Sequence, residues 1–437
     1  MALSTQPYKG ARDFYPEDLR LQKYIFTTVR QVVESYGYEE YDAPALEPLD
    51  LYLAKTGDEV VNEQTYAFED RGGRKVALRP EMTPTVSRLV AGRRQEMAYP
   101  ARLYNIGPRW RYERPQKGRW RQFIQMDVDM FGAQGVEADF EIITLSNDIM
   151  KAFGAKPSMY TIKLNSRVFM NYLLTDYFGF DDVQRASVAR LIDRIHKMSE
   201  EDFVTQLDVL CTPSQREAST VERLLAILQT KDIAALPDDL RDQPALADLK
   251  KVLAMLSDAS VTNAVFDLTV MRGLDYYTDI VFEVFDNDPE NNRSMYGGGR
   301  YAGLVGLFGV ESLTAVGFAM GDAVLGEFLQ GHGLVPELPT ETQVYAVLAG
   351  DVFAQAQPAL KELRAEGINV AVDLSGRALD KQFKSANKKG IQFALVIGEN
   401  ELNSGQFSLK NLKTGEESTH SITRIATMIQ DHRNEEL

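Results

Sequence analysis

The chain has 437 residues, of which 44% are hydrophobic, 25% charged and 10% aromatic; this composition excludes disordered and fibrous proteins, and no apolar run approaches the roughly 18 residues of a membrane-spanning helix. Its 48 basic and 63 acidic residues give a net charge of −15, which argues against a general nucleic-acid coat protein but says nothing about local patches. A single cysteine, four histidines and an N-terminus without an apolar signal segment exclude a disulfide framework and predict a cytoplasmic protein with no membrane partner and no cysteine- or histidine-rich metal site.

The first predicted element is an amphipathic helix. Its buried face repeats every three or four residues and comprises Leu21, Tyr24, Ile25, Thr28, Val29 and Val32. The helix is expected to end near Gly37, because glycine readily takes the left-handed conformation that closes a helix. The residues from Glu40 to Pro44 are then predicted to be extended as far as the proline.

Two strands joined by a basic loop are predicted next. Residues 101–113 and 119–131 alternate polar and apolar side chains over much of their length, and a proline and a glycine lie in the loop between them. This pattern is typical of an antiparallel pair.

Residues 109–121 carry six basic side chains and one acidic one. Since alternate side chains of a strand share a face, Arg109, Arg111 and Glu113 are expected on one face of the first strand. Arginines that converge on one face suit a polyphosphate, because the guanidinium group matches phosphate oxygens. The alternative is a solvated charged hairpin, which fits the interleaved tryptophans less well.

Residues 166–258 are polar, leucine-dotted and predicted to be a helical insertion, with Leu224, Leu225 and Leu228 as one apolar stripe. The strand pattern returns at residues 265–270 and 280–285. Two glycine- and tyrosine-containing motifs accompany these strands, RGLDYY at 272–277 and YGGGRY at 296–301. Glycines let a backbone approach a ligand, and tyrosines provide walls with a polar end, but each motif alone could equally be a β-bulge or a tight turn.

The C-terminal region is predicted to be a separate α/β domain. A linker with a glycine and two prolines lies near residues 331–342. Beyond it the pattern predicts strand, helix, strand, helix and strand at residues 344–348, 354–366, 368–374, 379–389 and 393–397. Such an order favours a parallel or mixed sheet.

Together these motifs resemble a known family, the class II aminoacyl-tRNA synthetases in their histidyl form. Residues 111–123 look like motif 2 of that family, residues 272–277 like its first histidine signature and residues 296–301 like its second. Residues 9–13 resemble the family's N-terminal opening, residues 40–44 resemble motif 1, and residues 78–83 resemble the segment that holds the substrate's amino group. The C-terminal region, with Gly376-Arg377 and Lys388-Lys389-Gly390, resembles the anticodon-binding domain. The resemblance covers nearly the whole chain.

This resemblance implies an α/β fold with an α+β catalytic core, namely the antiparallel sheet of a class II synthetase flanked by helices. In its terms the catalytic core comprises residues 1–165 and 259–330, the helical insertion residues 166–258, and the C-terminal α/β anticodon-binding domain residues 341–437. It also implies a homodimer formed through motif 1 around Pro44.

The implied activity is that of a histidine–tRNA ligase, in which L-histidine is activated by ATP and transferred to tRNA(His). Two anions must meet in the first step, so the site must be cationic and preorganised; Arg111 and Arg272 would be catalytic, with Mg²⁺ screening the remaining phosphate charge. The resemblance assigns histidine binding to Glu81, Met82, Thr83, Arg111, Gln125, Asp129, Arg272, Tyr276 and Tyr277, ATP binding to Arg111, Glu113, Arg119, Arg121 and Phe123, and tRNA binding to Arg114, Gln116, Arg377, Lys381 and Lys388.

Three positions depart from the family's pattern. Val324 stands where motif 3 usually has an ATP-binding arginine, Asp129 stands for a common glutamate, and Asp279 stands for a common glycine. Arg119, Arg121 or, more distantly, Arg300 are candidates to replace the missing charge. The valine slightly favours one alternative, a non-catalytic paralogue such as the regulatory subunit of ATP phosphoribosyltransferase. A second alternative is a histidine- or tRNA-sensing binding module, which would need only the pocket and the basic patch.

Overall fold

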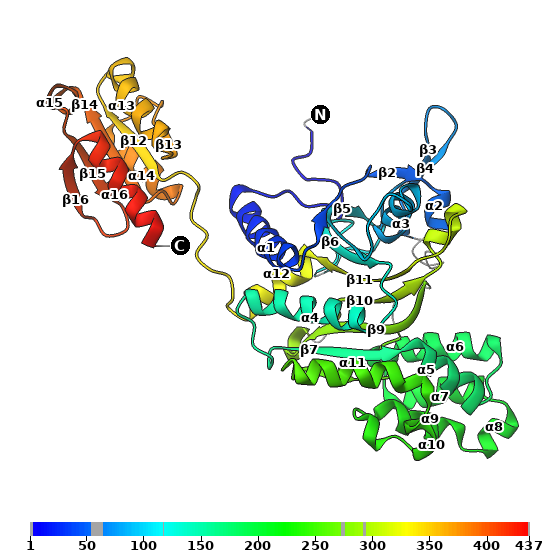
Figure 1. Cartoon of the computed structure of the whole chain (residues 1–437). Coiled ribbons are helices and arrows are strands. Elements are labelled where there is room, and N and C mark those ends of the chain that lie inside the picture. Colours follow the sequence, from blue (N-terminus) through cyan, green and yellow to red (C-terminus); the bar gives the residue numbers. More distant parts are fainter. Residues whose placement is uncertain (1–2, 54–63, 117, 272–275, 292–293, 436–437) are drawn as a thin grey trace. The chain divides into compact units, whose positions relative to one another are not determined.

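The computed structural model describes residues 3–53, 64–116, 118–271, 276–291 and 294–435 (Figure 1). The chain divides into two compact units, Met1–Val335 and Pro336–Leu437. All residues expected to bind histidine or ATP belong to the first unit. In the described part of the chain, no helix is long and apolar enough to cross a membrane.

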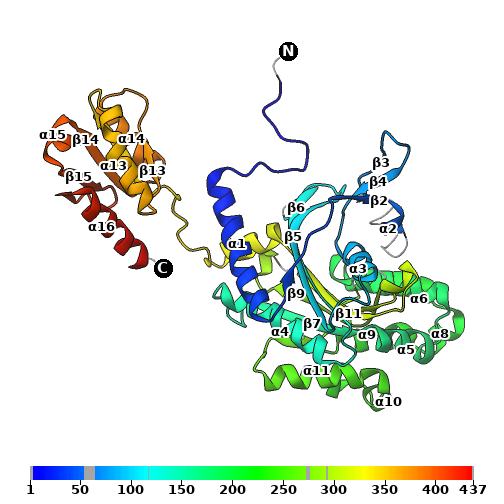
Figure 2. The ribbon, with the colours of Figure 1, turned by 45° about the horizontal axis from the view of Figure 1, so that its top comes forward.

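An eight-stranded sheet forms the centre of the first unit, with the strand order β1-β5-β6-β11-β10-β9-β7-β8. Its strands are β1 (Glu39–Glu40), β5 (Ala101–Trp110), β6 (Gln122–Phe131), β7 (Tyr160–Ser166), β8 (Ala264–Phe266), β9 (Tyr277–Asp286), β10 (Ser294–Ala302) and β11 (Thr314–Gly321). Neighbouring strands are antiparallel except at the two edges, where β1 pairs with β5 and β8 pairs with β7 in parallel. With helices flanking this sheet (Figure 2), the predicted fold class is confirmed.

Strands β5 and β6 form the predicted antiparallel pair, in a register that sets Arg109 opposite Phe123. The two faces of β6 differ in polarity because side chains alternate along a strand. Met126, Val128 and Met130 point into the apolar core, whereas Gln125, Asp127 and Asp129 line a cavity on the other face. The sheet therefore separates a helix-covered core from a polar site.

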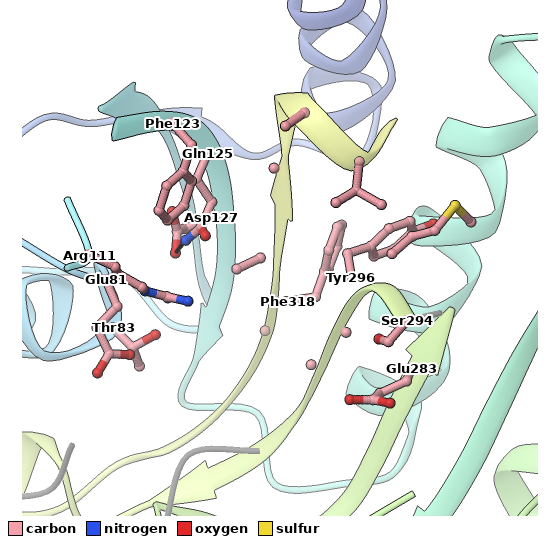
Figure 3. Close-up of a pocket in the computed structure, with 18 of the residues that line it drawn as sticks. Glu81, Thr83, Arg111, Phe123, Gln125, Asp127, Glu283, Ser294, Tyr296 and Phe318 are labelled. Carbon is pink, nitrogen blue, oxygen red and sulfur yellow. Dashed lines mark hydrogen bonds between the residues drawn. The ribbon is translucent and has the colours of Figure 1, made fainter. Parts of the chain in front are cut away.

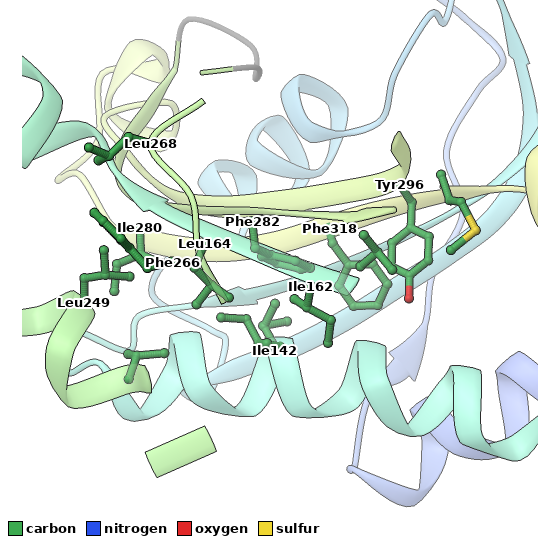
Figure 4. Close-up of a cluster of buried hydrophobic side chains, with 14 of the residues drawn as sticks. Ile142, Ile162, Leu164, Leu249, Phe266, Leu268, Ile280, Phe282, Tyr296 and Phe318 are labelled. Carbon is green, nitrogen blue, oxygen red and sulfur yellow. The ribbon is translucent and has the colours of Figure 1, made fainter. Parts of the chain in front are cut away.

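Helices α1 (Pro16–Ser35), α4 (Glu137–Ala152), α11 (Ala247–Asp258) and α12 (Asp322–Gly331) pack on or beside the apolar side of the sheet. Figure 4 shows Ile142 of α4 close to Ile162 and Phe282 of the strands, and Leu249 of α11 close to Phe266 and Ile280. Helix α1 buries Ile25 and Val29 as predicted, but also Phe26 and Val33. It begins at Pro16, and proline is favoured at the first helical position.

A small antiparallel sheet beside the large one has the order β2-β4-β3. It comprises β2 (Leu46–Pro48), β3 (Ala67–Glu69) and β4 (Lys75–Leu78), with helices α2 (Asp50–Leu53) and α3 (Thr83–Gly92) nearby. Strand β4 leads directly to the start of α3. This connection carries Glu81 and Thr83 to the wall of the cavity.

Residues 166–258 are helical, as predicted. The helices before α11 are α5 (Arg167–Tyr172), α6 (Asp182–Asp193), α7 (Glu200–Leu210), α8 (Pro213–Glu217), α9 (Thr220–Gln229) and α10 (Asp238–Arg241), with a π-helical turn at Leu173–Tyr177. The strand predicted at residues 265–270 is wrong beyond Phe266, where β8 ends. Leu268 and Val270 are buried in a turn, so their apolar character reflects burial and not strand pairing.

The second unit has a five-stranded mixed sheet with the order β13-β12-β14-β15-β16. Its strands are β12 (Val344–Ala349), β13 (Val370–Val372), β14 (Phe393–Gly398), β15 (Phe407–Asn411) and β16 (Glu417–His420), and its helices are α13 (Phe353–Ala365), α14 (Leu379–Lys388), α15 (Glu399–Ser404) and α16 (Ile422–Glu435). The first three strands are parallel and confirm the predicted alternation. The last two strands are antiparallel additions.

Candidate active site

A cavity of about 330 Å³ lies on the polar face of the large sheet (Figure 3). It brings together ten of the residues with predicted roles in histidine or ATP binding, namely Glu81, Thr83, Arg111, Glu113, Arg119, Phe123, Gln125, Asp129, Tyr276 and Tyr277. Met82 is fully buried at the start of α3, and Arg272 lies outside the described residues. Segments far apart in the sequence thus converge on one volume.

One end of the cavity is acidic and holds a buried carboxylate, Asp129. The hydroxyl of Tyr301 donates a hydrogen bond of 2.6 Å to its Oδ1, while its Oδ2 is buried without a hydrogen-bond partner among the described residues. Burial raises the pKa of this carboxyl to about 8, and the charges of Asp127 and Glu81 add to the rise against the opposing hydrogen bond from Tyr301. At neutral pH the group is therefore largely protonated, and one of its oxygens is unused.

Tyr276 and Tyr277 close the same end. The hydroxyl of Tyr276 donates to Glu81 Oε2 over 3.0 Å. Both tyrosines are buried, which raises the pKa of each hydroxyl above its ordinary value. They remain neutral donors, suited to a small polar ring or an amino group.

The glycine-rich motif lies in strand β10, where it permits a close approach of neighbouring strands. A Cβ on Gly298 would lie 2.0 Å from the carbonyl oxygen of Gly317, and one on Gly317 would lie 2.3 Å from Asp129 Oδ1. The glycines therefore bring β10 and β11 up to the carboxylate. Arg300 of the same motif is buried and ion-paired with Asp139, so its charge is already compensated inside the fold.

Arg111 lies beside Glu81, and Phe123 lies beyond it towards the other end of the cavity (Figure 3). Arg111 Nε donates to the carbonyl oxygen of Pro80 over 3.0 Å, and its guanidinium carbon lies 5.4 Å from the centre of the Phe123 ring. Figure 3 shows the Arg111 side chain directed into the cavity. Nearby, Arg119 Nη1 lies 3.3 Å from Glu113 Oε2. This end offers a fixed cation beside an aromatic face.

Two arginines of the basic segment lie elsewhere. Arg109 is fully buried, and its Nη2 lies 2.7 Å from Asp127 Oδ2. Because β5 ends at Trp110, the strand alternation that would place Glu113 on the same face as Arg109 does not extend that far. Arg121 is absent from the described cavity lining. Its Nε donates to the carbonyl of Glu113, and its guanidinium stacks 3.9 Å from the Tyr112 ring. The predicted convergence of all these arginines on one face is wrong.

The wall formed by the start of α12 is apolar at Ala323 and Val324. The preceding residue, Asp322, accepts hydrogen bonds from Arg12 Nη2 at 2.7 Å and from the Ile124 backbone amide at 3.1 Å. Arg12 in turn stacks over Trp120 at 5.2 Å. The N-terminal opening thus joins this part of the site by pairing with Asp322, a contact that sequence spacing did not reveal.

The cavity includes residues that the sequence analysis did not assign, among them Asp127, Glu283 and Ser294. The period-two alternation of β6 signals Asp127, because it lies between two assigned residues, Gln125 and Asp129. No comparable local pattern marks Glu283 and Ser294.

The residues expected to bind tRNA lie on the surface. Arg114 and Gln116 are exposed in the loop between β5 and β6, where Gln116 forms an isolated bridge with Arg119. In the second unit, Arg377, Lys381 and Lys388 are exposed on or just before α14. Pro44, expected at a dimer interface, is also exposed, just after β1.

Comparison with known proteins agrees with this geometry. Residues 10–323 match the family model described as histidyl-tRNA synthetase, and residues 342–432 match that of an anticodon binding domain. The chain is 39% identical over 431 residues to a histidine–tRNA ligase of Leptospira biflexa and 38% identical over 424 residues to one of Thermoplasma volcanium, with 98% and 97% of both chains covered. A crystal structure of histidyl-tRNA synthetase from Nostoc sp. PCC 7120 is similar with a TM-score of 0.82 and 25% identity, over 99% of this chain and 100% of that one.

Proposed function

The chain belongs to the histidyl-tRNA synthetase family and is an ATP-using histidine–tRNA ligase, and we propose that the cavity on the polar face of its large sheet is where histidine is activated. In the first step a histidine carboxylate oxygen attacks the α-phosphorus of ATP, and pyrophosphate leaves. In the second step a ribose hydroxyl at the end of the tRNA attacks the activated carbonyl carbon, and AMP leaves.

Histidine binds at the acidic end. The free Oδ2 of Asp129 and the Tyr276 hydroxyl face the imidazole, which has one donor and one acceptor when neutral. Glu81, Thr83 and Gln125 hold the amino and carboxylate groups. A buried polar group aimed at a ring nitrogen rejects analogues without it by up to about 10⁴–10⁵-fold, so this end gives the site its specificity.

ATP binds at the other end. Phe123 stacks on the adenine, Glu113 contacts its edge, and Arg111 holds the α-phosphate at the point of attack. Arg119 serves the outer phosphates, and Arg272 contributes to the carboxylate and the developing charge. A fixed cation stabilises that charge without reorganisation, which is the task Arg111 is placed to perform.

Mg²⁺ enters this scheme with the nucleotide. The described residues contain no group of three or more metal-ligating side chains. Nucleotide-bound Mg²⁺ needs only one or two protein carboxylates besides the phosphates, and Glu283 on the cavity wall would supply one. The ion would screen phosphate charge.

The partner is tRNA(His). Arg114 and Gln116 approach the acceptor end, and Arg377, Lys381 and Lys388 contact the anticodon region through phosphates, which lysines and arginines bind. We further propose a homodimer through the extended segment around Pro44 and a cytoplasmic location, where tRNA and ATP are available.

The position of Arg111, beside Glu81 of the acidic end and beside the Phe123 ring in one cavity, carries this proposal. Histidine-dependent exchange of pyrophosphate into ATP tests it, followed by charging of tRNA(His). Exchange without added histidine, or none at saturating ATP, would contradict histidine activation. A protein that binds histidine but lacks exchange would instead fit the regulatory paralogue.

A further inference from the structure

Residues 267–271, here called the strap, follow the end of β8 and are held by the core. The side chain of Asn165 on β7 donates to the carbonyl oxygens of Leu268 and Val270, over 3.2 and 3.0 Å. Arg167 Nη2 donates to the last carbonyl of the strap over 3.4 Å. These side-chain hydrogen bonds hold the strap in place beyond Phe266, where the strand β8 has ended.

The helical insertion also contacts the strap, through an ion pair and a hydrogen bond. Lys231 Nζ lies 2.7 Å from Asp267 Oδ1, and His196 Nε2 lies 2.9 Å from the Thr269 hydroxyl. That hydroxyl donates to Asp267 Oδ1 over 2.6 Å. Both Lys231 and His196 come from residues 166–258, so the insertion reaches the strap at two linked points.

Two lysines hold the charge of the buried Asp267, and the hydrogen bond from Lys231 is the larger contribution. Lys163 Nζ on β7 lies 3.1 Å from Asp267 Oδ2. Burial would raise the pKa of Asp267, but hydrogen bonds from Lys231 and Thr269 and the charge of Lys163 outweigh burial and lower the pKa to about 2. Lys231 therefore ties the insertion to the strap through an ion pair with a buried carboxylate, and Lys163 compensates only part of the charge of Asp267.

The strap precedes the residues that form the histidine end of the cavity. The chain passes from Met271 to Tyr276, which bonds to Glu81, and to Tyr277, which begins β9. Arg167 links the strap to this end through described residues, because it bonds to the Met271 carbonyl and its positive charge also acts on the Tyr277 hydroxyl, where it opposes the rise in that group's pKa. A shift of the strap would therefore be felt at Tyr276.

We propose that Lys231 and His196 are positioning residues for histidine activation, which hold the strap against the insertion and so set the geometry of the histidine end of the cavity. This inference rests on the proposed function. It assigns to the insertion a part in the first reaction step, before any tRNA is bound.

The test replaces Lys231 by methionine in the full-length protein. Lys251→Met is the control, because Lys251 also belongs to the insertion and its Nζ also lies 2.7 Å from a carboxylate of the catalytic core, the exposed Glu137 Oε1 on α4, which is not part of the strap. Misplacement of a binding group by a small distance can cost up to about 10²-fold. In the pyrophosphate-exchange assay, we expect kcat/KM for histidine to fall about tenfold in K231M and less than twofold in the control.

Three further measurements separate positioning from stability and from the proposed function. K231M should melt at a lower temperature than the control, because it removes the main partner of a buried carboxylate, so exchange is compared at a temperature at which both variants are folded. K231R retains the charge and should restore most of the activity. Histidine affinity measured by calorimetry without ATP should weaken in K231M. Control-like kinetics and affinity in K231M, or no restoration by arginine, would overturn the inference, whereas absence of exchange in the unmodified protein would overturn the proposed function instead.

Discussion

Replacement of Asp129 by asparagine should make the stability of the first unit less dependent on pH. Burial raises the pKa of this carboxyl from 3.8 to about 8, so folding favours its protonated form. Below about pH 4 the carboxyl is protonated in both the folded and the unfolded chain, and burial carries no penalty. As the pH rises the unfolded chain gains the charge first, and the penalty grows until the folded pKa is reached.

The size of the effect follows from the pKa difference. Each pKa unit corresponds to about 1.36 kcal/mol, and pH 7 lies about three units above the unfolded value, so the penalty at pH 7 is about 4 kcal/mol. Asparagine has nearly the same shape and carries no titrating charge. The stability of D129N relative to the unmodified protein should therefore rise by about 1.4 kcal/mol per pH unit between pH 4.5 and 7.5.

Chemical denaturation at several pH values measures this difference. The chain has two tryptophans, Trp110 and Trp120, and both lie in the first unit, so their fluorescence reports that unit alone. Tyr301→Phe is a useful companion, because it removes a hydrogen bond that lowers the Asp129 pKa and should extend the sloping range to higher pH. Parallel stability curves for D129N and the unmodified protein would refute the reasoning.

Three other changes test the site and the domain organisation. Gly298→Ala should destabilise the first unit by about 3 kcal/mol, since its Cβ would meet the Gly317 carbonyl; Gly331→Ala, which meets nothing within 4 Å, is the control in the same denaturation assay, and equal stabilities would contradict the close-approach argument. A chain ending at residue 335, the boundary of the first unit, should retain pyrophosphate exchange but charge tRNA poorly, and full charging would remove the second unit from tRNA binding. Val324→Arg should lower the KM for ATP by about 10- to 150-fold if it adds one charge-assisted hydrogen bond of 1.5–3 kcal/mol, and an unchanged KM would mean that the missing charge is supplied elsewhere.

Local patterns in the sequence were sufficient to predict the elements whose pairing is local. The β5–β6 pair follows from alternation on both sides of a proline- and glycine-containing loop, and the parallel strands of the second unit follow from regular spacing of strands and helices. Strands β15 and β16 were not predicted. They are short additions whose identity depends on the free edge of β14, and an edge is a property of the folded sheet.

For a similar reason, the sequence did not predict which arginines are buried in ion pairs and which reach the cavity. Arg109 and Arg111 are two residues apart, yet one is sealed against Asp127 and the other reaches the cavity. The difference depends on the strand end at Trp110 and on the acid opposite. Arg300 was a candidate to replace the positive charge missing at Val324, but it forms an ion pair with Asp139 of α4. The two residues are far apart in the sequence, so the ion pair could not be predicted from local patterns.

The same pairing explains how a cavity lined by several acids can serve a reaction between two anions. Of its described carboxylates, Asp127 is paired with Arg109 from within the sheet, and Glu113 lies against Arg119. Asp129 is largely protonated at neutral pH because burial raises its pKa to about 8. The negative charges of these three groups are thus neutralised before substrate enters, and Glu81 and Glu283, which also line the cavity, are the acids that the proposed scheme leaves to the histidine amino group and to Mg²⁺. Arg111 can then act on the phosphate and carboxylate that must meet, because a preorganised cation is worth most where neighbouring charges do not cancel it.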